Sequence, residues 1–415
     1  MNRIYLCIDL KTFYASVECV ERGLDPFKTD LIVADVARSK GAICLAISPK
    51  MKERGIHNRC RVYEIPKWVH PIVAKPRMKK YIEYSARIYG IYLKYISKED
   101  IHPYSIDEMF LDVTTYLNLY KKTPFELAKT IMKDIFDTTG ITSSCGIGTN
   151  MYLTKIALDI IAKHNKDHIG YLDEELYKEK LWHYEPLTDF WMISTGTESR
   201  LHKLRIKDMY DIANTREEVL YKEFGVNARF LIDHSKGIEP CTIKDIKAYK
   251  PKSHYLSNSQ ILYSDYDYKK ARIVLIEMID NLVLELNNKE LCTNNIGIYI
   301  GYSKDIYPAL KLSFKIDSTN NYELIRNRIL LEYDYRINEK IPIRRIGISF
   351  NNVGKRKFEQ MNLFQIENKK DEQIEKTIMD IKNKFGKNAI LRAVSYEDGA
   401  TGIARNKLIG GHNAG

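Results

Sequence analysis

The chain has 415 residues and a formal net charge of +11, from 65 Lys and Arg against 54 Asp and Glu. This length is enough for about two to four domains. The basic excess suggests a polyanionic partner, although it also fits an ordinary basic protein. The 7 cysteines show no C-x-x-C spacing, which argues against a zinc site or a disulfide framework. No apolar run approaches the ~20 residues that cross a bilayer, and Asp9 interrupts any leader peptide, so we expect a cytoplasmic protein.

The first 170 residues alternate between strand and helix patterns. An N-terminal strand ending at Asp9 leads into a helix, and a hairpin is predicted over residues 101–113. Further strands are predicted over 31–34 and 43–47, and further helices over 79–96, 125–136 and 153–162. This order favours an α+β sheet.

The rest of the chain reads as three more regions. Residues 171–243 have short helical segments with glycine breaks and no convincing strand, which predicts a small helical domain. Residues 244–253 are polar and lysine-rich, as in a linker. The pattern from 254 to 353 predicts a β-α-β-β-α-β domain, because a helix with apolar positions at a 3.6-residue period follows its first strand. The charged tail, 354–415, contains one predicted helix near 371–385.

Acidic residues occur at the ends of two strands in the first region. Asp9 closes the N-terminal strand, and Asp107 and Glu108 lie near the turn of the hairpin. Burying an ionised carboxylate without a partner is very costly, and a bound dication removes that cost. Taken alone, Asp9 could be a helix cap and the Asp107–Glu108 pair could be turn residues. Together, three carboxylates from neighbouring strands predict a site for two Mg²⁺ ions, as used in nucleotidyl transfer. Asp112 is interpreted as a turn or cap residue.

Three motifs carry a resemblance to a known family. The stretch from Asp9 to Glu18 resembles the N-terminal motif of the Y-family (translesion) DNA polymerases. The stretch from Tyr104 to Asp112 matches their S-I-D-E-x-x-L-D motif, and Gly146 to Ala157 resembles their third block. The match covers about residues 1–350 and is similar to the UmuC-like bacterial branch, in particular the Gram-positive UV-damage repair proteins.

The resemblance implies a multidomain α+β polymerase with a right-hand architecture. Its palm would be ferredoxin-like, its fingers small, its thumb helical, and its little finger would be the β-α-β-β-α-β domain that clasps DNA. The implied boundaries are palm 1–12 and 79–170, fingers 13–78, thumb 171–243, linker 244–253, little finger 254–353 and tail 354–415.

The resemblance also implies roles for the acidic and aromatic residues. Asp9 and Asp107 would bind both metal ions, with the Leu10 carbonyl completing one coordination shell. Glu108 would lie by the primer 3′-hydroxyl as a ligand or proton acceptor. Tyr14 corresponds to the steric gate that excludes a ribose 2′-OH, and the Phe13 N–H would touch the same sugar or its triphosphate.

Further positions are expected to contact phosphate. Lys155 and Lys52 fall where the family has triphosphate-binding cations, and Ser48 stands where the family more often has Tyr or Asn. The segment Ser194–Thr197 matches a helix-hairpin-helix turn but has a single glycine, Gly196, which leaves phosphate binding there open.

The tail contains a peptide similar to the bacterial sliding-clamp peptide, with Gln360, Met361, Leu363 and Phe364 as its anchors. A UmuD-like accessory subunit is a further possible partner within this family. The segment Gly410-Gly411-His412 also resembles the Gram-positive subgroup, with no role assigned to it.

The sequence therefore predicts a template-directed DNA polymerase of low fidelity, without proofreading, that takes primer-template DNA and dNTPs. Two alternatives remain at this point. A nucleotide cyclase has a similar palm, but needs neither a clamp peptide nor a DNA-clasping domain. A non-catalytic, clamp-bound repair factor would not need the full carboxylate set.

Overall fold

The computed structural model describes residues 3–37, 41–251, 254–303, 307–355 and 369–415. The chain divides into two compact units. The first comprises Met1–Tyr249 with His412–Gly415, and the second comprises Lys250–Gly411. No helix in the described part of the chain is long and apolar enough to cross a membrane.

A five-stranded sheet forms the centre of the first unit, in the order β5-β6-β1-β7-β8. The central strand β1 (Tyr5–Leu10) is antiparallel to both β6 (Glu108–Asp112) and β7 (Ser143–Gly148). The edges are β5 (Ile101–Pro103) and β8 (Ile169–Leu172). The predicted hairpin over 101–113 is confirmed, and β1 is buried between two neighbours because almost all of its residues are apolar.

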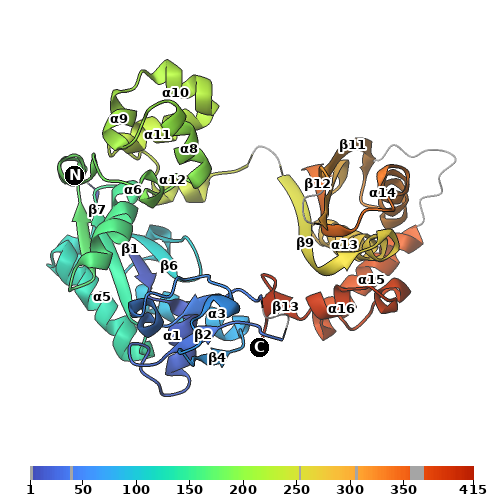
Figure 1. Cartoon of the computed structure of the whole chain (residues 1–415), viewed down its shortest axis with the longest axis horizontal. Helices are drawn as coiled ribbons and strands as arrows, with labels where there is room; N and C mark the ends of the chain where they lie inside the picture. The colour runs from blue at the N-terminus through green and yellow to red at the C-terminus, as the bar shows by residue number, and fades with distance from the viewer. Residues whose placement is uncertain (1–2, 38–40, 252–253, 304–306, 356–368) are drawn as a thin grey trace. The chain divides into compact units, whose positions relative to one another are not determined.

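Helices cover this sheet (Figure 1). The long helices α3 (Met78–Tyr92) and α5 (Pro124–Thr139) pack against each other, and α5 also packs on β7. Helix α6 (Met151–Ile156) lies on β7 so closely that a Cβ at Gly146 would be 2.0 Å from the Thr154 carbonyl oxygen. Gly146 and Gly148 of the third motif are therefore needed for this helix-to-strand contact. A π-helical turn, Ala157–Ile161, continues α6.

A smaller three-stranded sheet occupies the region predicted as fingers. Its order is β3-β2-β4, with β2 (Leu31–Val33), β3 (Ala46–Ile47) and β4 (Ile72–Ala74). Helices α1 (Phe13–Val20) and α2 (Pro49–Glu53) accompany it. The sequence pattern missed β4, although Pro71 and Pro76 flank it, because it is only three residues long and two of these are exposed.

The remainder of the first unit is helical, as predicted for residues 171–243, and the short helix Tyr116–Tyr120 was not predicted. Its helices are α4 (Tyr116–Tyr120), α7 (Glu174–Leu181), α8 (Thr195–Lys203), α9 (Met209–Asn214), α10 (Glu217–Phe224), α11 (Ala228–Ser235) and α12 (Ile243–Ala248). Helix α12 occupies the first half of the predicted linker 244–253, and the two compact units divide after Tyr249, within the same range. Thr242 and Asp245 form a capping box that starts this helix, and Ile243 is buried in a core cluster with Tyr5 and Phe110 of the first sheet.

The second unit is a four-stranded antiparallel sheet with two helices on one face. The sheet order is β11-β10-β12-β9. Its strands are β9 (His254–Tyr266), β10 (Thr293–Tyr302), β11 (Leu310–Thr319) and β12 (Ile343–Val353). Helices α13 (Tyr268–Asn288) and α14 (Tyr322–Arg336) bury one face of the sheet in a continuous apolar core. This confirms the predicted β-α-β-β-α-β pattern.

The tail packs on the same helices. Helix α15 (Lys369–Phe385) contacts α13, and buried Glu277 of α13 accepts hydrogen bonds from the backbone N–H groups of Thr401 and Gly402, at the start of α16 (Gly402–Arg405). The sliding-clamp-like peptide, 360–364, lies outside the described residues.

The segment Gly410-Gly411-His412 forms part of a small hairpin. Gly410 and Gly411 have φ values of 58° and 82° and connect β13 (Leu408–Ile409) with β14 (His412–Asn413). Two consecutive positive φ angles are those of a two-residue hairpin turn, which favours glycine. Beyond it, the Ala414 carbonyl accepts a hydrogen bond from the Lys79 N–H at the start of α3. The turn of this hairpin therefore explains why glycine occurs at both positions.

Candidate active site

The strand register brings two of the predicted carboxylates together. Asp9 of β1 lies directly opposite Glu108 of β6, and the Leu10 N–H donates to the Asp107 carbonyl oxygen at 2.9 Å. Directly opposite residues on antiparallel strands share one face of the sheet. Asp9 and Glu108 therefore project from the same face, and Asp107 is the adjoining residue of the hairpin.

Glu108 is held by two neighbours in a nearly closed environment. Only 6% of the residue is exposed, and its Oε1 lies 2.8 Å from the Lys155 Nζ. The Cys7 thiol donates to the same oxygen at 3.1 Å. The chain thus supplies a cation and a thiol to one oxygen of a buried carboxylate.

Lys155 is itself enclosed by acidic groups. It is 7% exposed, and its Nζ also lies 3.0 Å from Asp159. Burial lowers the pKa of this amine, but Asp159 and Glu108 outweigh burial and raise the pKa. The geometry is that of a buried ion pair, whereas the resemblance implied an open phosphate contact for Lys155.

The electrostatics of Asp9 fit a cation site. Burial, followed by the charges of Asp107 and Glu108, raises the pKa of Asp9 from 3.8 to about 7. A dication would relieve both effects, and oxygen-only donors are those that Mg²⁺ prefers. Among the described residues, however, no three His, Cys, Asp or Glu side chains already stand in a metal-binding arrangement. One reason lies in Glu108, since its Oε1 is engaged with Lys155 and Cys7.

Tyr14 follows Asp9 after a short connection, since only two residues separate β1 from α1. Thr12 in this connection has a left-handed φ of 46°, which is unusual for a non-glycine residue. The half-buried Tyr14 ring stacks on Tyr81, with ring centroids 4.4 Å apart. The Tyr81 hydroxyl in turn donates to buried Glu18 at 2.8 Å. The predicted gate residue therefore stands on a fixed aromatic support.

Three further lysines interact electrostatically around Asp9. Burial lowers the pKa of Lys11 to about 8, while Asp9 raises it and Lys52 lowers it. Desolvation also lowers the pKa of Lys52. Asp9 raises this pKa, and Lys163 lowers it further. Lys163 also acts on Asp9, whose pKa it lowers. Lys11, Lys52 and Lys163 form what we call the lysine cluster, and sequence reasoning identified Lys52 alone.

Ser48 does not support its predicted role as a phosphate contact. Its side chain is fully buried, its Oγ donates to the Thr29 carbonyl at 2.6 Å, and it accepts from the Leu31 N–H. Ser194, by contrast, is the N-cap of α8, where its Oγ accepts from the Thr197 N–H. Ser48, the residue before α2, therefore connects the start of that helix to the start of β2.

Sequence reasoning missed four contributors to this site. Cys7 and Asp159 contact Glu108 and Lys155, and Lys11 and Lys163 belong to the lysine cluster. Period-two alternation would have placed Cys7 on the face of Asp9, and the i, i+4 spacing would have paired Lys155 with Asp159. Lys163 follows Asp159 by four residues and pairs with it at 3.2 Å, so the same spacing would have identified this lysine.

Comparisons with known proteins agree with this fold and site. The impB/mucB/samB family matches residues 8–159, which contain all three carboxylates. A putative UV-damage repair protein, UvrX, from Bacillus subtilis is 32% identical, covering 99% of this chain and 97% of that protein. DNA polymerase IV 2 from the same organism is 30% identical and covers 99% of both chains.

A solved structure described as a Y-family DNA polymerase chimera matches with a TM-score of 0.64. It covers 85% of this chain and 100% of that one at 21% identity, which supports the fold. The chain belongs to the Y-family DNA polymerases. It is a translesion-type, DNA-directed DNA polymerase, so its substrates are primer-template DNA and dNTPs, and the cyclase and scaffold alternatives are set aside.

Proposed function

We propose that this polymerase transfers nucleotides with two Mg²⁺ ions, held by Asp9, Asp107, Glu108 and the Leu10 carbonyl. The observation that carries the proposal is the cross-strand pairing of Asp9 with Glu108, together with the raised pKa of Asp9. The bound ions would activate the primer 3′-hydroxyl and neutralise charge on the reacting phosphates. Lys155 acts through Glu108, as a positioning residue that holds this buried carboxylate in place by their 2.8 Å contact.

The lysine cluster is proposed to bind the triphosphate of the incoming dNTP. Burial lowers the pKa values of Lys11 and Lys52, because it removes water from their ammonium groups. A bound polyanion would stabilise the charged form of each lysine in place of that water. Lys163 pairs with Asp159 at 3.2 Å, but 57% of its side chain is exposed, so it can exchange this partner for a ligand phosphate. Positioning and charge neutralisation supply most of the catalysis in such reactions.

Tyr14 is proposed to exclude ribonucleotides. Its ring is fixed on Tyr81, so it cannot easily yield to a 2′-OH. Phe13 is the first residue of α1, where a backbone N–H has no partner within the helix. That N–H is proposed to contact the dNTP sugar or triphosphate.

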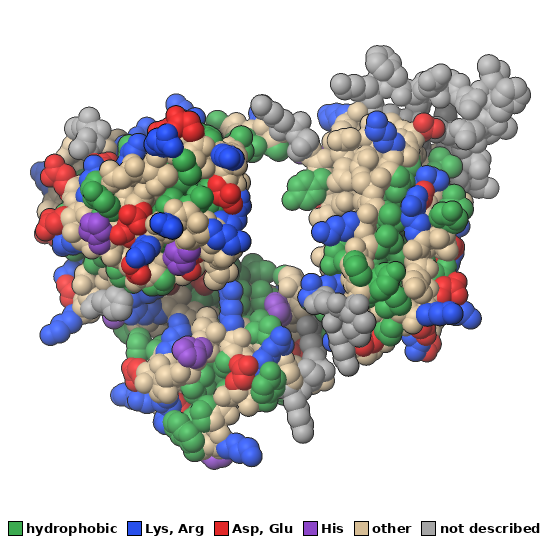
Figure 2. Space-filling model, turned by 45° about the horizontal axis from the view of Figure 1, so that its top comes forward, with side chains coloured by type: hydrophobic (Ala, Val, Ile, Leu, Met, Phe, Trp, Pro, Cys, Tyr) green, Lys and Arg blue, Asp and Glu red, His purple; other side chains and the backbone are tan. Residues whose placement is uncertain are grey.

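The open face of the second sheet is proposed to clasp duplex DNA. Small residues occur near its centre, since Gly347 pairs with Ser259, and Ser349 pairs with Ser257 and with Gly297. Lys311 and Lys315 of β11 are exposed there. Small polar side chains let phosphates approach the strands, and lysines neutralise them without reading sequence. Lys and Arg side chains occur on the visible faces of both units, interspersed with Asp and Glu (Figure 2).

Beyond DNA, we propose a bacterial sliding clamp as a partner, through the peptide 360–364, and a UmuD-like subunit as a second. The peptide's order of Gln, Met, Leu and Phe in a charged tail supports the first, and the family resemblance supports the second. Low fidelity, absence of proofreading and bypass of damaged bases are proposed on the same resemblance. The cytoplasm, where DNA and dNTPs occur together in bacteria, is the proposed location.

Primer extension with the purified chain tests the carboxylate assignment. Asp107→Ala should abolish Mg²⁺-dependent extension while duplex binding survives, since phosphate contacts elsewhere hold the DNA. Asp112→Asn is the matched control on the same strand, because Asp112 has local structural partners. It accepts a hydrogen bond from the Thr114 N–H and pairs with Arg3 at 3.1 Å. Extension by the Asp107→Ala protein at an unchanged rate would refute the assignment.

A further inference from the structure

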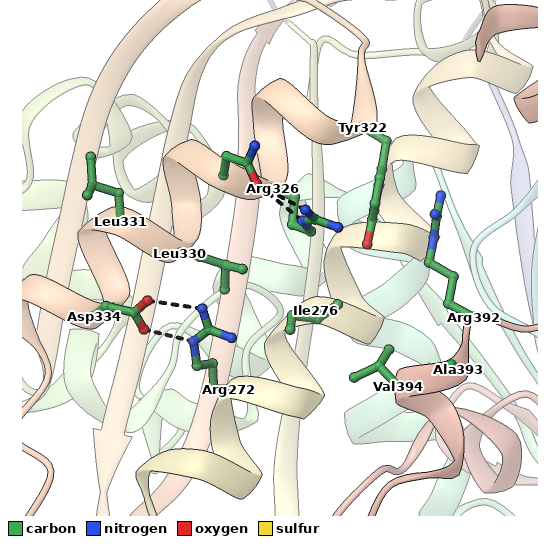
Figure 3. A pocket seen from close by; sticks show the side chains of 11 residues that line it. Arg272, Ile276, Tyr322, Arg326, Leu330, Leu331, Asp334, Arg392, Ala393 and Val394 are labelled. Carbon is green, nitrogen blue, oxygen red and sulfur yellow. Dashed lines mark hydrogen bonds and ion pairs between the residues drawn. The ribbon is translucent and has the colours of Figure 1, made fainter. Parts of the chain in front are cut away.

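The helical face of the second unit contains a pocket that the polymerase activity does not use. Its volume is about 830 Å³, within the range of ligand sites. It lies among α13, α14 and the segment before and within the short helix Ala393–Tyr396 (Figure 3). The residues that line it are Arg272, Ile276, Tyr322, Arg326, Asn327, Leu330, Leu331, Asp334, Arg392, Ala393 and Val394.

The pocket is long in one direction. Tyr322, Arg326, Leu330 and Asp334 of α14 line it at i, i+4, i+8 and i+12, and therefore form one stripe along the helix. Twelve residues of helix rise about 18 Å. An extended peptide of about five residues has that length.

One end of the pocket contains an unsatisfied donor. Tyr322 is only 4% exposed, and its hydroxyl has no hydrogen-bond partner among the described residues. The Arg392 guanidinium stacks on its ring at 3.6 Å, and Arg326 lies 5.5 Å from the ring centroid. Figure 3 shows the hydroxyl directed into the pocket. A buried hydroxyl without a partner is costly, so a ligand acceptor is expected at this end.

The arginines add directed positive charge at the same end. Arg326 is paired with Glu323 at 2.6 Å, and Arg392 with Asp280 and Glu375. A guanidinium has five N–H donors, so these pairs leave donors for a further carboxylate. At the other end, Asp334 takes Arg272 in a two-point pair of 2.8 and 3.0 Å, which leaves that end electrically balanced.

The rest of the lining is apolar. Ile276, Leu330, Leu331 and Val394 supply it, and Leu331 is 60% exposed. Apolar walls and the acidic Asp334 disfavour a nucleic-acid backbone, whose phosphates would gain nothing from them. Together with the length, they favour a peptide.

We propose that this pocket docks a peptide segment of a partner protein that presents a carboxylate next to apolar side chains. The carboxylate binds between Tyr322 and Arg326, and the apolar side chains cover Leu330 and Leu331. This pocket differs from the proposed sliding-clamp peptide. The pocket would receive a peptide of a partner protein, whereas the clamp peptide of this chain would itself be received by the clamp.

The test uses the full chain and the probe Leu-Asp-Leu-Leu-amide, labelled with fluorescein at its N-terminal amine, in an anisotropy titration. Tyr322→Phe removes one oxygen and should weaken binding by about tenfold, the effect of one hydrogen bond to a charged group. Leu331→Glu should weaken it at least as much, because it adds a like charge to an exposed position. Leu324→Glu is the matched control on the same helix, since Leu324 is 49% exposed outside the lining, and should change binding by less than about twofold.

Several results would overturn the proposal. A probe with Asn in place of Asp should bind at least about tenfold more weakly, and equal binding would exclude a carboxylate site. Loss of binding in Leu324→Glu as large as in Leu331→Glu would mean that the pocket is not the receptor. Full displacement of the probe by inorganic phosphate or by a short DNA duplex would assign the pocket to those anions, and no binding at about 1 mM would reject it as a peptide site. Primer extension by Leu331→Glu should remain at the wild-type rate, which separates this site from catalysis.

Discussion

Replacing Lys155 by Met separates two explanations of this lysine. The substitution keeps the length of the side chain and removes its charge, which leaves Glu108 buried without a cation. Breaking a buried pair in this way costs about 3–5 kcal/mol. We expect about 3 kcal/mol, because the Cys7 thiol still donates to Glu108 and the second partner, Asp159, is 25% exposed.

Lys163→Met is the matched control. Lys163 also pairs with Asp159, at 3.2 Å, but 57% of its side chain is exposed. Its removal should cost less than about 1 kcal/mol. Urea unfolding followed by tryptophan fluorescence reports the relevant unit, because Trp68, Trp182 and Trp191 all belong to the first.

Kinetics supply the second measurement. Lys163→Met should raise the KM for dNTP, whereas Lys155→Met should lower kcat with a smaller change in KM, and Lys155→Arg should restore most of kcat. A Lys155→Met protein that is as stable as the Lys163→Met protein, with a raised KM alone, would refute the ion-pair explanation. Lys155 would then be the triphosphate ligand that the family resemblance implied.

Three other predictions concern the gate, the metal ions and the clamp. Tyr14→Ala should increase ribonucleotide incorporation by about tenfold or more, while Tyr81→Phe, which keeps the supporting ring, should not; unchanged sugar discrimination in Tyr14→Ala would remove the gate. Since the pKa of Asp9 is about 7 without metal, protons compete with Mg²⁺ below that pH, and the half-saturating Mg²⁺ concentration should rise about tenfold per pH unit there. The measurement is a Mg²⁺ titration of primer extension at several pH values. A half-saturating Mg²⁺ concentration that does not change from pH 7 to pH 5.5 would contradict this prediction. Leu363→Ala with Phe364→Ala should abolish pull-down by a bacterial sliding clamp while basal synthesis continues, and Asn362→Ala should retain the pull-down.

Most of the fold could be predicted from hydrophobic periodicity. The helix α13 and the strands around it were evident because its apolar positions follow a 3.6-residue period over 21 residues. Strand β4 and helix α12 were missed for different reasons. The first is three residues long and mostly exposed, and the second lies in a lysine-rich segment whose capping box, rather than its composition, starts the helix.

The candidate site was predictable where the chemistry is local in sequence. Asp9, Asp107 and Glu108 stand out because carboxylates rarely end buried strands. Ser48 shows the limit of a positional argument, since its hydroxyl is used within the fold. The i, i+4 spacing connects Lys155 with Asp159 and Asp159 with Lys163, but it does not show that this helix face lies beside Asp9.

The site combines two opposite electrostatic arrangements within one strand pair. Glu108 has a cation from its own chain, in Lys155, whereas Asp9 has none at contact distance among its described contacts and carries a pKa of about 7. A fold that needed these carboxylates only for structure would gain stability from a second lysine beside Asp9. The lysine cluster instead acts on Asp9 only through longer-range charge, and it leaves the oxygen of Asp9 without a permanent partner. Uncompensated charge at that position is a cost to the folded chain, and the proposed Mg²⁺ ions would offset it during the reaction.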